Sequence, residues 1–213
     1  MSSQLVDFKL YLITDRKIFK TEDDFITAVE SALSAGVKAV QLREKDLATR
    51  ELLDMACRFR DLTRRYGASL FINDRIDIAL GVDADGVHLG NAGVPVHAAK
   101  RMAHDRLIIG CSTHSLKEAV CAEEEGADFI TFGPVFKTPS KLQYGEPVGL
   151  EALCEVTKKV SLPVYGLGGI KTDNVEVVLS SGAKGIALIS GILARPDRAD
   201  AAREYLTKVG ERL

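Results

Sequence analysis

The chain has 213 residues, of which 46% are hydrophobic and 27% are charged, and its formal net charge at neutral pH is −2. This balance is typical of globular domains and excludes disordered, collagen-like and coiled-coil chains. The near-neutral charge disfavours a nucleic-acid binder, no apolar run approaches the ~18 residues of a membrane span, and the first residues lack a signal-peptide pattern.

One pattern recurs along the chain: a helix-like stretch ends in a small or acidic residue plus glycine, and a short apolar run follows. A glycine here closes a helix in the left-handed conformation. A short apolar run after it is typical of a buried strand. In chain order the predicted strands are Leu10–Thr14, Ala39–Leu42, Ser69–Ile72, Gly86–Leu89, Leu107–Gly110, Phe129–Phe132, Pro163–Leu167 and Ile186–Ile189.

Segments with helical periodicity alternate with these strands. Ser115 is a good N-cap for one of them, and Glu118 three residues later predicts a capping box. In chain order the predicted helices are Asp24–Ala35, Thr49–Arg65, Ile76–Gly81, Val96–Ala103, Leu116–Glu125, Leu150–Lys159, Asp173–Ser180 and Arg198–Val209.

Eight strand–helix units in 213 residues leave about 27 residues for each unit. Strands this apolar are typical of parallel sheets, which are covered on both faces. The sequence therefore predicts an α/β fold, a single (β/α)8 TIM barrel over residues 1–213. The alternative is an open doubly wound sheet, which normally has fewer strands and a Gly-x-Gly-x-x-Gly turn after the first one.

The active site of such a barrel lies at the C-terminal ends of its strands, where this chain is rich in polar residues. Arg43 and Lys45 follow the second strand two positions apart, and with Lys141 they predict a cationic site for a di- or polyphosphate. The alternative is a solvated pair of cations that Glu44 and Asp46 neutralise.

Two further strand ends carry candidate binding residues. Gly168-Gly169 and Ser190-Gly191 follow the last two strands, where barrels commonly bind a phosphate through backbone N–H groups. The alternative is that these glycines only form tight turns. Asn73-Asp74 offers oxygen ligands for Mg²⁺, the alternative being that Asp74 caps the next short helix.

Histidines and cysteines give weaker signals. His114 lies at a strand end, where it can face the site, whereas His88 is expected to pack inside a strand. No Ser/His/Asp triad or Cys/His pair is evident, and Cys111 has no adjacent cation to activate it. The cysteines lack metal-type spacing, so we expect reduced, buried thiols in a cytoplasmic protein; they are Cys57, Cys111, Cys121 and Cys154.

Five motifs occur in a familiar order over nearly the whole chain: Gln41–Lys45, Phe71–Arg75, Asp85–Gly90, Gly133–Lys141 and Gly168–Ile170. Together they resemble the family of thiamine-phosphate synthase and the TenI thiazole tautomerase. The resemblance implies a (β/α)8 barrel that joins a pyrimidine diphosphate to a thiazole phosphate. In that reaction pyrophosphate leaves first and the thiazole nitrogen traps the pyrimidine cation, so charge neutralisation and orientation matter most.

The resemblance also assigns roles to residues of this chain. It implies Mg²⁺ as the cofactor, bound by Asp74, and it makes Arg43, Lys45 and Lys141 catalytic. It implies that the pyrimidine diphosphate is held by Gln41, Arg43, Lys45, Asn73, Ser112 and Lys141. It implies that the thiazole phosphate is held by Thr138, Pro139, Ser140, Gly169, Ile189 and Ser190.

The chain departs from the family pattern at the metal site. After the His-Leu-Gly run the family has Gln and, two residues later, a second Mg²⁺-binding Asp, where this chain has Asn91 and Gly93. We hypothesise that Gly93 weakens Mg²⁺ binding and slows the synthase reaction. Ser140 replaces the usual Thr but keeps its hydroxyl group, so little effect is expected.

Two other functions stay open. A TenI-like tautomerase needs no diphosphate site, but the histidine of a characterised TenI branch falls at Pro134 of this chain. A catalytically impaired barrel that binds thiamine precursors is the other alternative. Phosphorylated small molecules are the expected partners, without nucleic acid or membrane, and an exposed apolar patch on a barrel helix would allow a homodimer.

Overall fold

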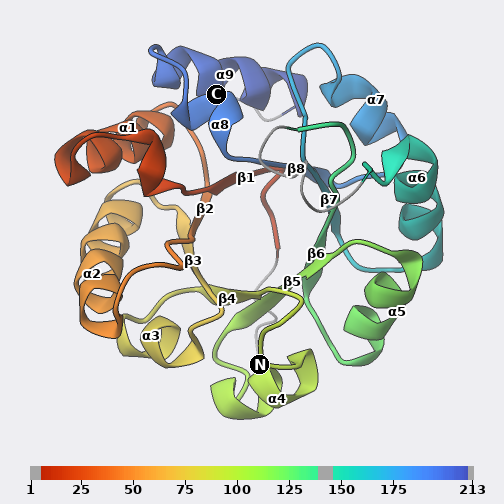
Figure 1. The fold of residues 1–213 in the computed structure, drawn as a ribbon, viewed down its shortest axis with the longest axis horizontal. Coiled ribbons are helices and arrows are strands. Elements are labelled where there is room, and N and C mark those ends of the chain that lie inside the picture. The colour runs from red at the N-terminus through yellow and green to blue at the C-terminus, as the bar shows by residue number, and fades with distance from the viewer. Residues whose placement is uncertain (1–5, 139–145, 211–213) are drawn as a thin grey trace.

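The computed structural model describes residues 6–138 and 146–210. Every strand pairs in parallel with the next, and the last pairs with the first, so the sheet closes into a barrel (Figure 1). The predicted TIM barrel is therefore confirmed, and the open sheet is excluded. The strands are β1 (Leu10–Ile13), β2 (Ala39–Leu42), β3 (Ser69–Asn73), β4 (Gly86–Leu89), β5 (Ile108–Thr113), β6 (Phe129–Phe132), β7 (Val164–Leu167) and β8 (Gly185–Leu188).

Helices form a ring around the barrel, and α9, from the end of the chain, packs beside α1, from its start (Figure 1). The helices are α1 (Glu22–Ser34), α2 (Thr49–Arg65), α3 (Ile76–Gly81), α4 (Val96–Ala103), α5 (Leu116–Glu124), α6 (Gly149–Lys159), α7 (Val175–Ser180), α8 (Ser190–Leu193) and α9 (Arg198–Lys208), with a 3₁₀ turn η1 (Arg16–Ile18). No helix of the described residues is long and apolar enough to cross a membrane.

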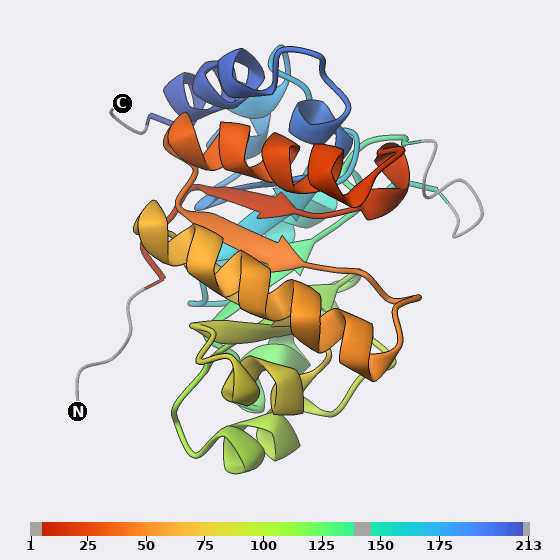
Figure 2. The same ribbon diagram turned by 90° about the vertical axis from the view of Figure 1, so that its left-hand side faces the viewer.

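The predicted elements agree with the structure except at some ends. The strand predicted over Leu107–Gly110 runs three residues further, because Ser112 and Thr113 pair with Thr131 and Phe132 of β6. The turn η1 and helix α8 were not predicted, since segments of three and four residues show no helical period. The arrowheads of β1 and β2 point to the same end of the barrel (Figure 2).

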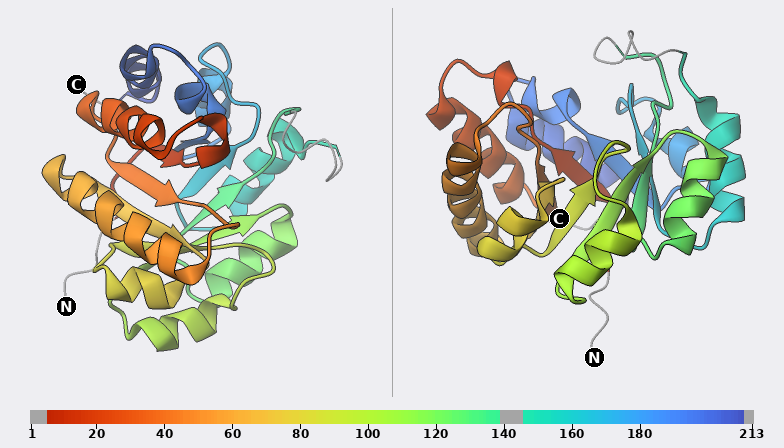
Figure 3. Two further views of the ribbon diagram at one scale, coloured as in Figure 1. Left: turned by 60° about the vertical axis from the view of Figure 1, so that its left-hand side comes forward. Right: turned by 60° about the horizontal axis from the view of Figure 1, so that its bottom comes forward.

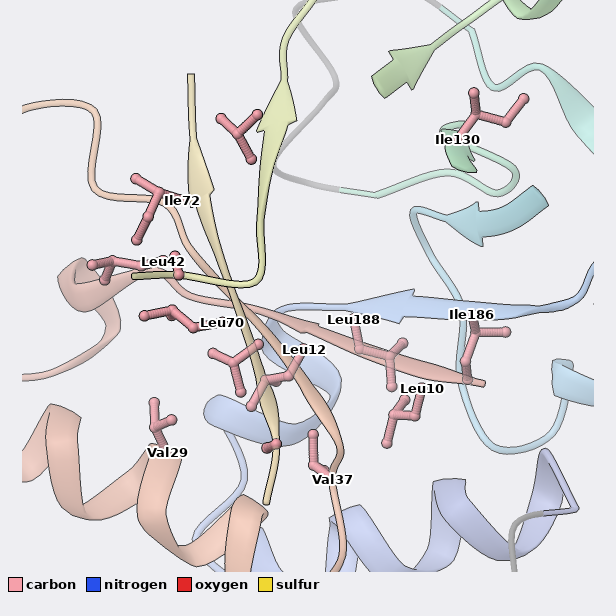
Figure 4. Packing of buried hydrophobic residues seen from close by; sticks show 14 of the residues in the cluster. Leu10, Leu12, Val29, Val37, Leu42, Leu70, Ile72, Ile130, Ile186 and Leu188 are labelled. Carbon is pink, nitrogen blue, oxygen red and sulfur yellow. The ribbon is translucent and has the colours of Figure 1, made fainter. Parts of the chain in front are cut away.

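Alternation along each strand builds two separate cores. Outward-facing residues such as Leu10, Leu12 and Leu188 pack against the surrounding helices (Figure 4). On the far side of the barrel from α1, helices α5 and α6 lie next to each other and cover the wall in the same way (Figure 3). Because both faces are covered, the strands are apolar nearly throughout, as a parallel sheet requires.

The barrel interior is filled by aromatic rings. Phe8 enters the barrel below β1 and stacks on Tyr165 with ring centroids 4.9 Å apart. Tyr11 meets Phe71 edge-to-face at 5.3 Å, and Phe129 completes the layer. This layer closes the barrel from below, so the candidate site can open only at the C-terminal ends of the strands.

Gly110 faces the barrel interior and has no room for a side chain, which gives a stability prediction. A Cβ at Gly110 would lie 2.4 Å from the Phe129 ring and 2.6 Å from His88 Nδ1. Gly110→Ala should therefore lower the free energy of unfolding by about 1–3 kcal/mol, because overpacking forces neighbouring rings to move. Urea denaturation measures this change. Gly81→Ala is the matched control, since nothing lies within 4 Å of its added methyl group; an equal loss in both variants would contradict the prediction.

Candidate functional site

Strand register gathers polar side chains into one layer above the aromatic rings. Asn73 of β3 lies opposite His88 of β4, and Ser112 of β5 lies opposite Thr131 of β6. Gln41 of β2 is buried at the same end of the barrel, and its Nε2 donates to Tyr11 Oη over 3.2 Å. The structure thus brings the predicted residues Gln41, Asn73 and Ser112 to the mouth of the barrel.

The carboxylate of Glu44 turns away from that mouth. It is 4% exposed, and its Oε1 accepts from the hydroxyl of Thr14 over 2.6 Å. Both of its oxygens accept from the backbone N–H of Arg16, each over 3.1 Å. Glu44 is therefore fixed against the loop that follows β1 and is occupied there.

Asp46 also pairs on the β1 side of this loop. Its Oδ2 lies 2.7 Å from Arg16 Nη2 and 3.4 Å from Lys17 Nζ. The alternative that the two acids of the loop neutralise Arg43 and Lys45 is therefore wrong. The guanidinium of Arg43 forms no ion pair with a carboxylate of the described residues, whereas Lys45 Nζ lies 3.7 Å from Asp74 Oδ2.

The side chain of Asp74 faces the loop after β4 and not helix α3, which follows Asp74 in the chain. Its Oδ1 accepts from the backbone N–H of Gly90 over 2.6 Å, and its Oδ2 accepts from Asn73 Nδ2 over 2.8 Å. Helix α3 has Arg75 at its N-cap position and no side-chain cap. The helix-cap alternative for Asp74 is therefore wrong, and its carboxylate lies at the mouth beside Lys45.

Gly93 covers this carboxylate closely. A Cβ at Gly93 would lie 2.7 Å from Asp74 Oδ1 and 3.1 Å from the carbonyl oxygen of Gly90. Among the described residues, no cluster of three or more His, Cys, Asp or Glu side chains is placed to hold a metal ion. Since Mg²⁺ commonly binds through one or two carboxylates plus substrate phosphates, Asp74 fits a Mg²⁺ shared with a diphosphate and not a site made by protein alone.

His88 supports Ser112 from inside the barrel. Its Nε2 lies 3.0 Å from Ser112 Oγ and 3.4 Å from Thr131 Oγ1, while burial lowers the pKa of His88 to about 3. Its Nδ1 is buried without a partner among the described residues. We assign the proton of the neutral ring to Nε2, because a buried N–H without a partner costs more than a lone pair. Ser112 then accepts from His88, and its own hydroxyl hydrogen is available to a bound anion.

His114 is attached to the rim by its ring. Its Nδ1 contacts the carbonyl oxygen of Gly133 at the end of β6, and its backbone N–H donates to Glu118 Oε2 over 2.6 Å. Ser115 caps α5 as predicted, since its Oγ accepts from the N–H of Glu118 over 3.2 Å. The predicted capping box is not formed, because the Glu118 side chain bonds to His114 instead.

The loop after β6 is joined to the end of β7 by backbone hydrogen bonds. Val135 donates to the carbonyl of Leu167 over 2.8 Å, and Phe136 donates to that of Gly168 over 3.0 Å. These bonds hold the loop against the end of β7 up to Phe136. Thr138 is the last described residue before residue 146. The predicted residues Pro139, Ser140 and Lys141 lie outside the described residues.

Packing explains the glycines at the ends of β7 and β8. Gly169 has a φ of +67°, and a Cβ there would lie 2.7 Å from Phe136 Cβ. A Cβ at Gly191 would lie 2.9 Å from Tyr205 Oη. Ile189 is half-buried against the inner core, and Ser190 is exposed at the start of α8. A phosphate site here stays a prediction, because close packing alone accounts for the glycines.

The cysteines are free, as expected, but not buried. Cys57 and Cys121 are exposed, and Cys111 and Cys154 are half-buried. Burial raises the pKa of the Cys111 thiol to about 11, in agreement with a thiol that is not an activated nucleophile.

Sequence reasoning missed the residues that hold the predicted ones in place. Tyr11 and Thr131 were read only as parts of strands, Thr14 only as a polar residue at the end of the first strand, and Glu44 only as a counter-charge. The signal available was a hydroxyl or carboxyl group inside an apolar run, since a buried polar group requires a partner. The identity of that partner depends on which strands are neighbours.

Comparison with known proteins places this barrel in a family. A family model described as thiamine monophosphate synthase matches residues 10–192. The chain is 53% identical over 201 residues to a putative thiamine-phosphate synthase of Geobacter sulfurreducens, and the match covers 94% of each chain. It is 43% identical over 192 residues to the thiamine-phosphate synthase of Clostridium novyi, covering 90% of this chain and 94% of the relative.

A solved structure shows the same architecture. The thiamine phosphate pyrophosphorylase of Pyrococcus furiosus is 42% identical, superposes with a TM-score of 0.86, and is matched over 95% of both chains. This agreement covers nearly the whole chain. The family suggested by the five sequence motifs is thereby confirmed.

Proposed function

Because the chain belongs to the thiamine monophosphate synthase family, we propose that it is a thiamine-phosphate synthase, a transferase that joins 4-amino-2-methyl-5-hydroxymethylpyrimidine diphosphate to a thiazole phosphate and releases pyrophosphate. The observation that carries the proposal is the cationic pair Arg43 and Lys45 at the barrel mouth, from which the acids of their own loop are turned away. Among the described residues the acid that pairs with these two cations is Asp74, 3.7 Å from Lys45 Nζ, so positive charge remains to favour a polyanionic ligand.

The reaction needs stabilisation of the leaving diphosphate more than it needs a base. The bond between the pyrimidine methylene carbon and the diphosphate oxygen breaks, and its electron pair leaves with the diphosphate. The thiazole nitrogen then donates its lone pair to the carbon and forms the new C–N bond. Arg43 and Lys45 stabilise the charge that develops on the leaving group, in a layer that the protein has organised beforehand.

Neutral groups of the same layer hold the diphosphate in place. Ser112 offers its hydroxyl hydrogen, because His88 already supplies the hydrogen that its oxygen accepts. Gln41 and Asn73 present amide groups from the neighbouring strands β2 and β3, Gln41 beside Tyr11 and Asn73 beside Asp74. The aromatic layer around Tyr11 closes the barrel below them, so water reaches the reacting carbon only from the mouth.

Asp74 would hold Mg²⁺ jointly with the diphosphate, and the ion would supply further charge neutralisation on the leaving group. Asn73 and the N–H of Gly90 orient this carboxylate, which lies between Lys45 and the loop of Gly93. With a single carboxylate, the site depends on the substrate for its remaining charged ligands. We therefore propose that metal binding is weak before the diphosphate arrives.

Gly93→Asp should lower the Mg²⁺ concentration needed for half-maximal activity. The added carboxylate would lie beside that of Asp74, because the Cβ position is 2.7 Å from Asp74 Oδ1. Two adjacent carboxylates repel each other when no cation is bound, and a single bound cation neutralises both of them. A Mg²⁺ titration of product formation measures the activity. The melting temperature, measured with EDTA and with Mg²⁺, should show a larger rescue by Mg²⁺ than in the wild type.

Gly93→Asn is the matched control, since it brings the same crowding without the charge. It should leave the Mg²⁺ requirement unchanged or raise it. If the Asp and Asn variants respond to Mg²⁺ alike, the missing acid does not limit metal binding in this chain.

Product formation by the purified protein tests the proposed function directly. The protein would be mixed with the pyrimidine diphosphate, the thiazole phosphate and a series of Mg²⁺ concentrations, and thiamine phosphate would be detected. Turnover that rises with Mg²⁺ is the expected result. No product at any Mg²⁺ concentration would contradict the synthase proposal.

A thiazole tautomerase is the second candidate, and the single carboxylate at the metal position favours it. Moving a proton within a thiazole carboxylate phosphate requires neither Mg²⁺ nor a diphosphate. Pro134 occupies the position of the histidine used by a TenI branch, so another group would have to transfer the proton. Conversion of the thiazole tautomer without any synthase turnover would favour this function.

The cellular setting is also proposed. Free cysteines support a reducing, cytoplasmic location. A homodimer stays a proposal, because the exposed large apolar side chains do not share one helix; in the described residues they are Ile18, Val94, Met102 and Val177. Light scattering on a sizing column would give the mass in solution.

A further inference from the structure

A chain of hydrogen bonds leads from a buried acid to the backbone of the cationic loop. The backbone N–H of Arg43 donates to Thr14 Oγ1 over 2.9 Å, and Thr14 Oγ1 donates to Glu44 Oε1 over 2.6 Å. The N–H of Thr14 also donates to the carbonyl of Gln41 over 2.9 Å. The loops after β1 and β2 are thus joined at the residues just below Arg43.

The direction of every hydrogen in this chain is determined. A backbone N–H can only donate, so Thr14 Oγ1 accepts from Arg43 and its own hydrogen points to Glu44. Both oxygens of Glu44 also accept from the N–H of Arg16. A carboxylate accepts at both oxygens, whereas an amide would place an N–H group at the Oε2 position, 3.1 Å from the backbone nitrogen of Arg16, which is itself a donor.

Stability alone is a poor reason for an acid at this place. Glu44 is buried, and burial raises its pKa while the bonds from Thr14 and Arg16 oppose that rise. Its nearest cation, Arg16 Nε, is 3.9 Å from Oε2 and is itself buried without a hydrogen-bond partner in the described part of the chain. A buried ion pair of such imperfect geometry often stabilises a fold less than apolar residues would.

Alternation along the loop links Glu44 to the site. Glu44 and Asp46 bond to the β1 side, and the residues between and before them, Lys45 and Arg43, are the ones that carry free or mouth-facing charge. Glu44 begins a turn in which its carbonyl accepts from the N–H of Leu47 over 3.3 Å, so fixing its side chain against β1 restrains the residues on either side of it. Thr14 also restrains the backbone of Arg43, because its Oγ1 accepts from the backbone N–H of Arg43.

We propose that Glu44 is a positioning residue, which acts through Thr14 to aim Arg43 and Lys45 at the diphosphate of the substrate. That the diphosphate belongs to the substrate rests on the proposed function. That Glu44 orients the two cations toward a polyphosphate does not. Glu44 itself does not touch the substrate. Its loss should therefore weaken the recognition of the diphosphate more than it weakens the fold.

The first test compares Glu44→Gln, Thr14→Val and Thr14→Ser with the wild type. The readouts are the dissociation constant of inorganic pyrophosphate by calorimetry, KM and kcat where turnover exists, and the melting temperature. Glu44→Gln and Thr14→Val should each weaken pyrophosphate binding about tenfold, equivalent to one lost hydrogen bond of about 1.4 kcal/mol. Thr14→Ser keeps the hydroxyl group and should bind pyrophosphate as the wild type does.

Two further variants separate positioning from general disturbance. The double variant Glu44→Gln with Thr14→Val should bind pyrophosphate about as weakly as each single variant does. The two losses should not add, because both substitutions break the same chain of hydrogen bonds. Asp46→Asn is the control on the same loop, since Asp46 is exposed and pairs only with the half-buried side chain of Arg16 and the exposed side chain of Lys17 among the described residues. It should leave pyrophosphate binding unchanged.

Several outcomes would overturn the proposal. These are wild-type pyrophosphate affinity in the folded Glu44 and Thr14 variants, a lower melting temperature without any change in affinity, and equal losses in Thr14→Ser and Thr14→Val. If Glu44→Gln does not fold, the two Thr14 variants decide the question. A wild-type protein that does not bind pyrophosphate would also overturn it. A wild-type protein that binds pyrophosphate but makes no product would contradict only the proposed function.

Discussion

Replacing Asp74 with asparagine is expected to lower kcat for thiamine phosphate formation by about 100-fold or more at saturating substrates, the scale for losing one element of transition-state charge stabilisation. Asp74 is the acid placed to share Mg²⁺ with the diphosphate. Asparagine keeps an oxygen that accepts from the N–H of Gly90, and it tolerates the φ of +58° at this position. The fold should therefore survive while the charge is lost.

The measurement is steady-state turnover across a Mg²⁺ series, with the melting temperature recorded for each protein. Asp77→Asn is the matched control, because Asp77 is an exposed acid three residues away that pairs with Arg75 over 2.6 Å. It should retain wild-type kcat. Full activity of Asp74→Asn with an unchanged Mg²⁺ response would show that the metal is held elsewhere or is not used.

Arg43→Gln should lower kcat/KM by about 100-fold or more, the second large effect we expect. The guanidinium is half-buried at the mouth and forms no ion pair with a described carboxylate, so its removal leaves no acid without a partner. The free energy of unfolding should consequently change little. Arg43→Lys should recover only part of the loss, because an ammonium group cannot bind a phosphate with two parallel hydrogen bonds.

Arg58→Gln provides the control for a lost arginine. Arg58 is on the outer helix α2, where it pairs with Glu22 and Asp23 at the surface. Its replacement should change neither kcat/KM nor pyrophosphate affinity. If Arg43→Gln behaved like Arg58→Gln, the cationic loop would not be the diphosphate site, and the observation that carries the proposed function would be lost.

Much of the barrel was predictable because its rules are local. The glycine that follows several of the helices and the short apolar run after it, as in Gly126 before Phe129–Phe132, depend on neighbouring residues only. Short elements escaped this reasoning, since η1 and α8 are shorter than the patterns that reveal helices. The exposure of the cysteines escaped it too, because a thiol side chain gives no sign of whether it lies on the buried face of its helix or strand.

The candidate site was predictable to the level of which loops contribute, and less so in how their side chains pair. Arg43, Lys45 and Asp74 were found from their position after apolar runs. Glu44 looked like their counter-ion from the sequence, yet it bonds to Thr14, thirty residues away. Likewise Asp74 looked equally suited to cap a helix, and only the N–H of Gly90 places it at the mouth.

The sequence by itself determined the alternation of strands and helices, the closed barrel and the family, because periodicity, helix ends and motif order are properties of short segments. The tertiary structure alone decided that Glu44 turns toward β1, that Asp74 meets Gly90 and that His88 supports Ser112. Each of those contacts joins residues that lie on, or in the loop directly after, different strands. Strand register and barrel closure determine which of these residues become neighbours, and no local pattern of residues carries that information.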